Sequence, residues 1–362
     1  MRPVGPVELV DAIWLTVGER RVLRLSSDTI ELEIAPDRGA DLLSLRYLPT
    51  GDQVMWRHPG HVTEFSGQTR PERTDESEFY DNYPGGMQEL FPNVGPACVV
   101  AGTALPFHGE ACRIPWNTRV ERTGNNITVF CETSLGQYPF TLERRLSIAD
   151  ASPVLSIEST ITNTSSDPLP VLWAFHPAFG DAITAGPSRL YADMENVTSH
   201  DGRLAGVRRF GAGDRVPFKK IGFDNVGELD LNKPDDHSGD LLYATCNSGW
   251  FALRNDQSGL TVGMSWPIGI FPYLWIWQEC HNPVNYPWWG QHHIVGIEPN
   301  SAIPMTGLAD AIAASTALVA EPNKPVTADL TMSIMVIPPN SGGPVGVGAD
   351  GRILTELAKQ HY

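Results

Sequence analysis

Two apolar segments of the chain, residues 171–180 and 291–300, each contain a side chain suited to proton transfer. The first is an apolar run that ends in His176 and a proline, and a proline interrupts strand pairing. In the second, the period of two along a strand places His292, Gly296 and Glu298 on one face. A carboxylate in an apolar strand is costly unless it is paired or has a function. Glu298 therefore stands out, whereas His176 alone fits a buried structural histidine as well as a functional one.

Residues 83–95 form a loop rich in glycine and proline that also carries Gln88 and Asn93. Glycines allow the backbone to approach a ligand closely. The same composition is found in an ordinary corner between strands. Taken alone, the loop is consistent with either interpretation.

Residues 107–116 bring together an imidazole, a carboxylate, a guanidinium group and an indole, with His108, Glu110 and Arg113 among them. Sugar sites combine polar groups for the hydroxyls with aromatic faces for the C–H surface. This segment has that mixture, and the aromatic residues around Trp275 would add a stacking wall.

In this order, the segments resemble the aldose 1-epimerase family of the galactose mutarotase-like superfamily, and most closely its DUF4432-type branch. The resemblance covers about residues 32–337. It rests on Gly85-Gly86 through Phe91-Pro92-Asn93, on Phe107-His108-Gly109-Glu110 with Trp116, on His176-Pro177-Ala178-Phe179 and on Glu298-Pro299. It implies that His108 binds substrate, that His176 is the general acid and that Glu298 is the general base.

The implied reaction is the interconversion of sugar anomers by ring opening, with no cofactor and no metal. We expect these residues to bind the sugar: His108, Glu110, Arg113, Gln88, Asn93, Trp275 and His292. The sequence lacks a clear counterpart of the Asn-Arg loop and of the hydroxyl-binding Asp of the best-known galactose mutarotases, and Glu110 stands where those enzymes are apolar. The resemblance therefore does not predict which sugar is bound.

Short runs of β-branched and aromatic residues between turn signals predict an all-β fold, a large antiparallel β-sandwich with few short helices. Examples of expected strands are 29–34, 127–130, 155–161 and 331–336, and the expected helices are 308–315 and 353–358. We expect one domain over residues 1–337 and a Pro/Gly-rich, loosely docked tail over 338–362. Gly346-Val347-Gly348-Ala349-Asp350-Gly351 matches GxGxxG, but too few residues follow for a dinucleotide site.

The chain of 362 residues has 26 Lys and Arg against 42 Asp and Glu, a formal net charge of −16. Nucleic-acid binding depends on Lys and Arg that neutralise phosphates, so a nucleic-acid partner is excluded. The N-terminal residues lack the apolar run of a signal peptide, and no later stretch has the length of a membrane span. We therefore expect a cytoplasmic monomer or homodimer that acts on a small-molecule carbohydrate.

Two other functions are compatible with the sequence. A metal-dependent sugar isomerase, lyase or ketosugar-processing enzyme on the same fold would use His108, Glu110, His176 and His292 as ligands, because imidazole and carboxylate suit a divalent metal. A non-catalytic carbohydrate-binding module would need only the aromatic residues and the glycine-rich loops. Such a module would not depend on Glu298.

Overall fold

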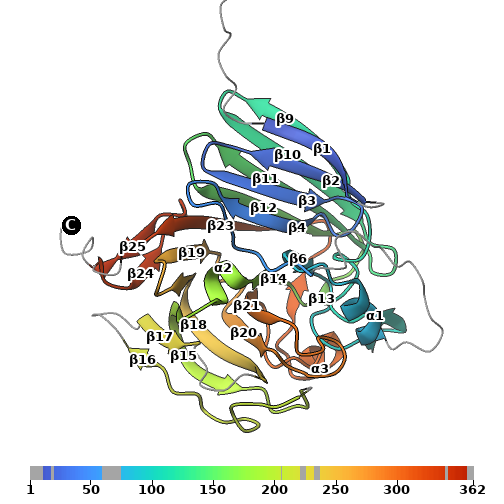
Figure 1. Cartoon of the computed structure of the whole chain (residues 1–362). Coiled ribbons are helices and arrows are strands. Elements are labelled where there is room, and N and C mark those ends of the chain that lie inside the picture. The colour runs from blue at the N-terminus through green and yellow to red at the C-terminus, as the bar shows by residue number, and fades with distance from the viewer. Residues whose placement is uncertain are drawn as a thin grey trace, which may run out of the picture.

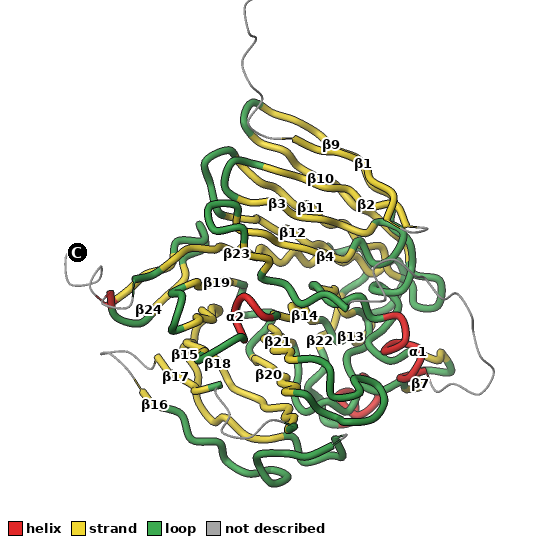
Figure 2. The backbone as a smooth tube through the Cα atoms, in the orientation of Figure 1, coloured by secondary structure: helices red, strands yellow, loops and turns green. Residues whose placement is uncertain are grey.

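The computed structural model describes residues 11–17, 20–58, 75–204, 206–220, 226–231, 237–338 and 341–356. Strands make up most of this part of the chain, and the helices are short (Figure 2). The helices are α1 (Asp75–Asn82), α2 (Asp181–Thr184) and α3 (Leu308–Ala313). The strands are β1 (Asp11–Val17), β2 (Arg20–Ser26), β3 (Ile30–Ala35), β4 (Asp41–Tyr47), β5 (Asp52–Gln53), β6 (Met87–Leu90), β7 (Cys98–Val100), β8 (Thr103–Leu105), β9 (Asn117–Thr123), β10 (Asn126–Ser134), β11 (Phe140–Ala149), β12 (Val154–Asn163), β13 (Leu169–Val171), β14 (Ala174–Phe179), β15 (Ser188–Ser199), β16 (Lys219–Lys220), β17 (Val226–Asp230), β18 (Ser238–Asn255), β19 (Leu260–Ser265), β20 (Tyr273–Cys280), β21 (His293–Asn300), β22 (Leu318–Ala320), β23 (Val326–Val336), β24 (Pro344–Val347) and β25 (Ile353–Thr355).

Most of the strands belong to one antiparallel sheet of 19 strands that folds back on itself. One arm runs β1–β2–β3–β4–β6–β14–β21–β20, and the other runs β9–β10–β11–β12–β23–β19. The two arms meet on the long strand β18. Figure 1 shows β1 to β4 and β9 to β12 together at the top of the molecule, as the two layers of a sandwich. The predicted all-β, antiparallel sandwich is therefore confirmed.

Along the strands, buried apolar side chains alternate with more exposed ones, and the buried side chains fill the space between the layers. On β11, Leu142, Leu146 and Ile148 point inward and are almost fully buried, while Glu143, Arg145 and Ser147 are more exposed. They belong to the same core cluster as Leu32 on β3 and Ile157 on β12. A period of two is the pattern that a half-buried strand requires.

The four strands expected from sequence fall within β3, β10, β12 and β23, apart from Thr29 immediately before β3. The helix expected at 308–315 is α3. The helix expected at 353–358 is wrong for Ile353–Thr355, which form β25 and pair with β24, whereas Leu357 and Ala358 lie outside the described residues.

The hairpin of β24 and β25 is packed against the sheet, which corrects the expectation that this part of the tail docks loosely. Val347 and Ile353 are buried against Tyr191, Trp250 and Ile337. The GxGxxG match spans the end of β24 and the hairpin turn, and a strand follows it instead of a helix. The burial of these apolar side chains holds the hairpin in place.

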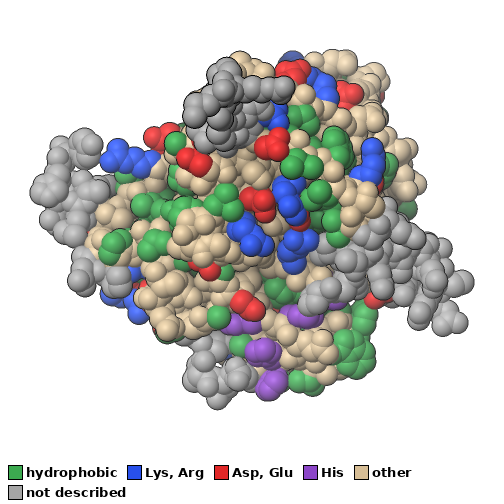
Figure 3. All heavy atoms as spheres, turned by 45° about the horizontal axis from the view of Figure 1, so that its top comes forward, with side chains coloured by type: hydrophobic (Ala, Val, Ile, Leu, Met, Phe, Trp, Pro, Cys, Tyr) green, Lys and Arg blue, Asp and Glu red, His purple; other side chains and the backbone are tan. Residues whose placement is uncertain are grey.

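Acidic and basic side chains are mixed on the face shown in Figure 3. Some of the basic side chains form ion pairs, as where Arg24 contacts Glu33 at 2.7 Å and Arg57 contacts the same carboxylate at 3.0 Å. In the described residues, no helix has the length and apolar character needed to cross a membrane.

Candidate active site

Four of the sequence-predicted site residues lie in one row across neighbouring strands. Gln88 on β6 is opposite His176 on β14, and Trp275 on β20 is opposite Glu298 on β21. The β14–β21 pairs on either side place His176 opposite Glu298. Side chains that are directly opposite each other share a face of the sheet. The register between these strands therefore brings the imidazole and the carboxylate together.

The His176–Glu298 contact is the centre of the site. His176 Nε2 lies 3.4 Å from Glu298 Oε1, and the two residues are only 6% and 2% exposed. The second carboxylate oxygen, Oε2, is buried and has no hydrogen-bond partner among the described residues. A buried polar atom without a partner is unusual in a folded protein and requires an explanation. Here it is consistent with a group that bonds to a ligand.

A cavity of about 280 Å³ adjoins this pair. Its wall is largely aromatic, and its charged residues, apart from Glu298, are Glu76, Glu279 and Arg203. The aromatic lining residues are Phe79, Tyr80, Tyr83, Phe107, Trp275, Trp277, Tyr286 and Trp288, together with His108 and His176. The volume is near the lower end of the range of about 300–1,000 Å³ for small-molecule sites.

Burial moves both members of the central pair toward their neutral forms. Removal from water lowers the pKa of His176 to about 4, and it raises the pKa of Glu298 well above its ordinary value. Desolvation disfavours the charged form of each group. At neutral pH the imidazole is therefore neutral, and desolvation favours the protonated form of the carboxyl group beside it.

His108 is fixed in one tautomer by the backbone of Gly95. The Gly95 backbone N–H donates to His108 Nδ1 at 3.1 Å. The backbone N–H of His108 donates to the Gly95 carbonyl at 3.0 Å. Burial, and to a lesser extent His176 and Arg113, lower the pKa of His108 well below its usual value. In a neutral imidazole whose Nδ1 accepts a hydrogen bond, Nε2 carries the proton. His108 can therefore donate a hydrogen bond to a substrate oxygen.

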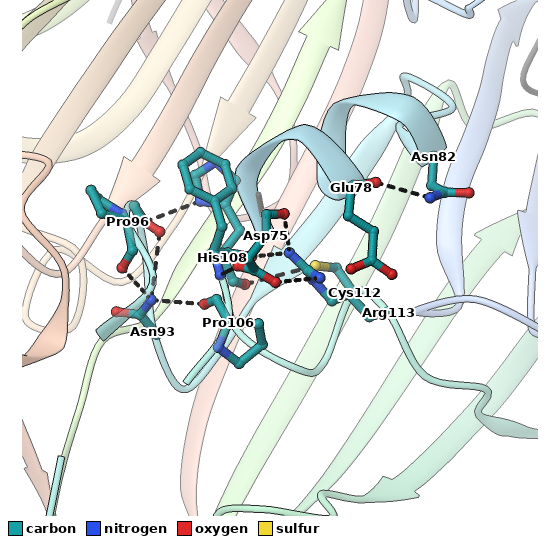
Figure 4. Close-up of polar contacts among 11 residues, drawn as sticks. Asp75, Glu78, Asn82, Asn93, Pro96, Pro106, His108, Cys112 and Arg113 are labelled. Carbon is teal, nitrogen blue, oxygen red and sulfur yellow. Dashed lines mark hydrogen bonds and ion pairs between the residues drawn. The ribbon is translucent and has the colours of Figure 1, made fainter. Parts of the chain in front are cut away.

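Arg113 does not line the cavity. Its guanidinium group contacts the Asp75 carboxylate at 2.9 Å and the Phe107 carbonyl at 3.0 Å (Figure 4). Asp75 is the first residue of α1 and also accepts a hydrogen bond from the Phe107 N–H. Arg113 therefore joins the start of α1 to the segment that carries His108.

Asn93 and Glu110 also have structural positions outside the cavity. The Asn93 amide donates to the carbonyls of Pro96 and Pro106, both at 2.9 Å (Figure 4), and its oxygen accepts from the Leu308 N–H. Glu110 accepts hydrogen bonds from the N–H groups of Gly136 and Gln137. These polar groups satisfy backbone atoms in a loop, so the structure does not place them on the sugar.

Gln88 and His292 do not line the cavity. Gln88 is buried and donates to the Gly85 carbonyl at 2.6 Å. His292 packs edge-on against Trp56, with ring centroids 5.2 Å apart, and contacts Trp288. Of the seven predicted binding residues, only His108 and Trp275 line the cavity.

Tyr83, which the sequence presented only as the start of a loop, is completely buried beside His176. Its hydroxyl lies 3.4 Å from His176 Nδ1. Phe79 and Tyr80, on α1, also line the cavity, although this acidic helix has no clear apolar period that predicts it from sequence. The sequence signal for Tyr83 was a tyrosine immediately before a Pro-Gly-Gly turn. That pattern does not distinguish a residue of an active site from an ordinary turn residue.

Among the described residues, no group of three or more His, Cys, Asp or Glu side chains could hold a metal ion. Of the ligands that the metal-dependent alternative requires, only His108 and His176 line the cavity, whereas Glu110 bonds to the backbone and His292 packs against Trp288. The four side chains do not converge on one point.

Solved structures share this fold at low sequence identity. The Slr1438 protein of Synechocystis sp. PCC 6803 has a TM-score of 0.63 at 19% identity and covers 90% of this chain and 99% of its own. A protein of Klebsiella pneumoniae, named as a proposed aldose 1-epimerase, has a TM-score of 0.69 at 15% identity, covering 90% and 83%. A galactose mutarotase related enzyme of Lactobacillus acidophilus has a TM-score of 0.56 at 17% identity, covering 87% and 97%.

The fold is thus galactose mutarotase-like, as the sequence resemblance predicted. The family model described as a domain of unknown function, DUF4432, matches residues 19–334, and the chain belongs to that family. No curated protein matches the sequence.

Proposed function

We propose that the protein is a mutarotase that interconverts the anomers of a free monosaccharide, with His176 and Glu298 as its acid–base pair. The observation that carries this proposal is the buried contact between His176 Nε2 and Glu298 Oε1 at the edge of the cavity, with Glu298 Oε2 left to bond a ligand. A binding module has no need for two opposed proton-transfer groups.

The reaction requires one proton to be taken and one to be given. In the assignment that the resemblance implies, Glu298 takes the proton of the anomeric hydroxyl and His176 protonates the ring oxygen. The bond between the anomeric carbon and the ring oxygen breaks, and the anomeric C=O bond forms. Rotation about the adjacent C–C bond and the reverse proton transfers close the ring on its other face. Each residue therefore acts once as acid and once as base.

The buried environment favours one of the two protonation states of the pair. Ring opening starts from ionised Glu298 and protonated His176 and ends with both groups neutral. Burial favours the neutral forms that the pair holds after ring opening and disfavours the charged forms from which ring opening starts. The pair returns to its charged form when Glu298 passes its proton to His176 or when the ring closes.

The remaining cavity residues suit a small uncharged ring. Trp275 and Trp277 offer flat apolar faces for sugar C–H groups, and His108 Nε2 is available to stabilise a sugar oxygen that gains charge. Trp275 is itself held in place, because its Nε1 donates to the Ala302 carbonyl at 2.8 Å. The volume of about 280 Å³ favours a monosaccharide over a longer chain.

The first experiment measures anomeric exchange by NMR on a panel of free aldoses, ketoses, deoxysugars and uronic acids, with and without a chelator. We expect exchange of at least one sugar, unaffected by the chelator. Glu298→Gln and His176→Asn should each lower the rate by about 10²–10⁴-fold, the usual contribution of a positioned proton-transfer group.

Matched controls are Glu132→Gln and His237→Asn, because both residues are exposed and lie outside the cavity. These variants should exchange sugar at the wild-type rate. Wild-type exchange in Glu298→Gln would contradict the assigned role, and exchange abolished by a chelator would contradict a cofactor-free mechanism.

A further inference from the structure

Tyr80 has the position of a residue that bonds to a bound molecule. It lies on α1 and lines the cavity, and no described residue forms a hydrogen bond with its hydroxyl. Two other tyrosines of the wall are bonded to the protein, Tyr83 to His176 Nδ1 at 3.4 Å and Tyr286 to the Ser77 carbonyl at 2.9 Å. A tyrosine hydroxyl inside a protein usually has a partner. The Tyr80 hydroxyl is therefore left for a ligand.

The Tyr80 ring is held by aromatic side chains from three segments of the chain. Its centroid lies 5.6 Å from that of Trp288, 5.8 Å from that of Phe79 and 5.9 Å from that of Phe107. The contacts with Trp288 and Phe79 are edge-to-face, with interplanar angles of 80° and 74°. Such pairs are a favoured arrangement of aromatic rings. The ring thus has a fixed direction before any substrate binds.

The helix that carries Tyr80 is tied to the protein on two sides. At its start, the Asp75 carboxylate contacts the Arg113 guanidinium group at 2.9 Å (Figure 4). One turn further on, the Ser77 carbonyl accepts the hydrogen bond of the Tyr286 hydroxyl. Arg113 and Tyr286 belong to the segments that supply Phe107 and Trp288. Helix and ring contacts therefore position Tyr80 together.

The surroundings of the Tyr80 hydroxyl favour an uncharged partner. Burial raises the pKa of Tyr80 well above its ordinary value, and the carboxylates of Glu76, Glu279 and Glu298 raise it further. The hydroxyl therefore keeps its proton and can donate it in a hydrogen bond. In the described lining, Arg203 is the one Lys or Arg side chain against these three carboxyl groups. An anionic ligand group would be repelled here, whereas a sugar hydroxyl would not.

In the proposed reaction, Glu298 and His176 act on the anomeric hydroxyl and the ring oxygen, so another hydroxyl of the sugar remains for Tyr80. From this arrangement, and on the basis of the proposed function, we infer that Tyr80 is a substrate-binding residue that donates to one of these other hydroxyl groups. It selects neutral sugars that carry this group over their deoxy and acidic analogues. A site that bonds a hydroxyl discriminates against an analogue without it, because the protein group is then left unpaired.

The test is a double-mutant cycle, with one change in the protein and the other in the sugar. Wild type and Tyr80→Phe, which keeps the packed ring, are assayed for anomeric exchange of D-glucose, D-galactose and D-mannose. The same assay is made with the uronic acid of each sugar and with the deoxy forms at each non-anomeric hydroxyl. Tyr80→Phe should lower kcat/KM for the parent sugar about 3–10-fold, the usual weight of one hydrogen bond between uncharged groups.

For the deoxy form that lacks the bonded hydroxyl, Tyr80→Phe should cause no further loss, whereas the other deoxy forms should lose as much as the parent. The matched control is Tyr138→Phe, which removes a buried hydroxyl that bonds to the Pro170 carbonyl outside the cavity. It should leave every kcat/KM unchanged. An equal loss for all sugars in Tyr80→Phe, or no loss for any, overturns the inference, and so does faster exchange of the uronic acids than of their parents.

The same cycle also separates this inference from the proposed function. If the wild type exchanges none of these sugars, their dissociation constants are measured by saturation-transfer NMR for the wild type and Tyr80→Phe. One deoxy form whose affinity does not respond to Tyr80→Phe would then sustain the binding role of Tyr80, while the proposed mutarotase function fails. If none of the sugars binds, the inference fails as well.

Discussion

Gly296 shows how one missing side chain makes room for the proposed base. A Cβ atom at this position would lie 2.9 Å from Glu298 Oε1 and 3.1 Å from the Trp277 ring. Because the carboxylate is the flexible end of a side chain, Gly296→Ala should move it away from His176 and leave the fold intact. A displacement of about 1 Å at a reacting group can cost about 10²-fold in rate. We therefore expect anomeric exchange at about 1–10% of wild type, with an unchanged melting temperature.

The matched control is Gly269→Ala, where a Cβ atom would meet nothing within 4 Å. That variant should keep full activity. If Gly296→Ala exchanged sugar as fast as Gly269→Ala, the position of the Glu298 carboxylate would not limit the reaction.

The sequence could predict some of these residues and not others, for physical reasons. The period of two correctly placed Gly296 and Glu298 on one face of β21, because that rule is local. The register that sets His176 opposite Glu298 joins distant strands and has no local signal. Gln88, Asn93 and Glu110 were predicted to bind substrate because a polar side chain in a glycine-rich loop looks the same whether it contacts a ligand or the backbone.

Among the elements, strand β6 has two faces that lie in different environments. Gln88 belongs to the row of the site, whereas the next residue, Glu89, points into the core toward β11. There Arg144 contacts Glu89 at 2.6 Å, and both side chains are almost fully buried. Ser159 Oγ and Trp173 Nε1 also donate to this carboxylate, each at 2.8 Å. The cluster joins β6, and Trp173 immediately before β14, to β11 and β12 in the opposite layer of the sandwich.

Arg144→Met should destabilise the protein strongly, because it leaves the Glu89 carboxylate buried without its cation. Breaking a buried pair in this way costs about 3–5 kcal/mol. Arg145→Met, one residue along β11, removes only an exposed pair with Glu158 and should cost less than about 1 kcal/mol. Urea denaturation of the two variants measures the difference. Equal free energies of unfolding would show that the buried pair does not hold the layers together.

Strands were predicted correctly from sequence where apolar and polar residues clearly alternate. The prediction failed where contacts with distant residues determine whether a segment is a helix or a strand. The strands within β10, β12 and β23 were found from their pattern. Ile353 begins a strand because it pairs with β24 and packs against Trp250, neither of which is visible in a short apolar run. Helix α1 was missed because only Phe79 among its eight residues is buried.

For the whole molecule, two buried acids link stability to pH. Asp41 is fully buried, and desolvation raises its pKa to about 7, while Glu298 is shifted in the same direction. A carboxyl group with a raised pKa in the folded state stabilises that state at low pH, and this contribution is lost as pH rises through the folded pKa. Asp41 therefore lowers the free energy of unfolding by up to about 1.4 kcal/mol per pH unit between its ordinary pKa of 3.8 and about pH 7, whereas His108 and His176, whose pKa values are lowered, raise it below about pH 6.5.

Asp41→Asn should remove the part of this slope that belongs to Asp41. Asp329→Asn, at an exposed position on β23, should leave the slope unchanged. Denaturant titrations at several pH values test this directly. If Asp41→Asn and the wild type showed the same dependence of stability on pH, Asp41 would be ionised throughout.

The pairing of β14 with β21 also has a consequence for synthesis of the chain. His176 leaves the ribosome well before Glu298, and the roughly 120 residues between them take on the order of ten seconds to be made. Until β21 emerges, β14 has β6 on one side and an open edge on the other, although all six of its residues are buried in the finished protein. An apolar open edge invites pairing with other chains. The strand that carries the proposed acid is thus exposed to pairing with other chains while the protein is being made.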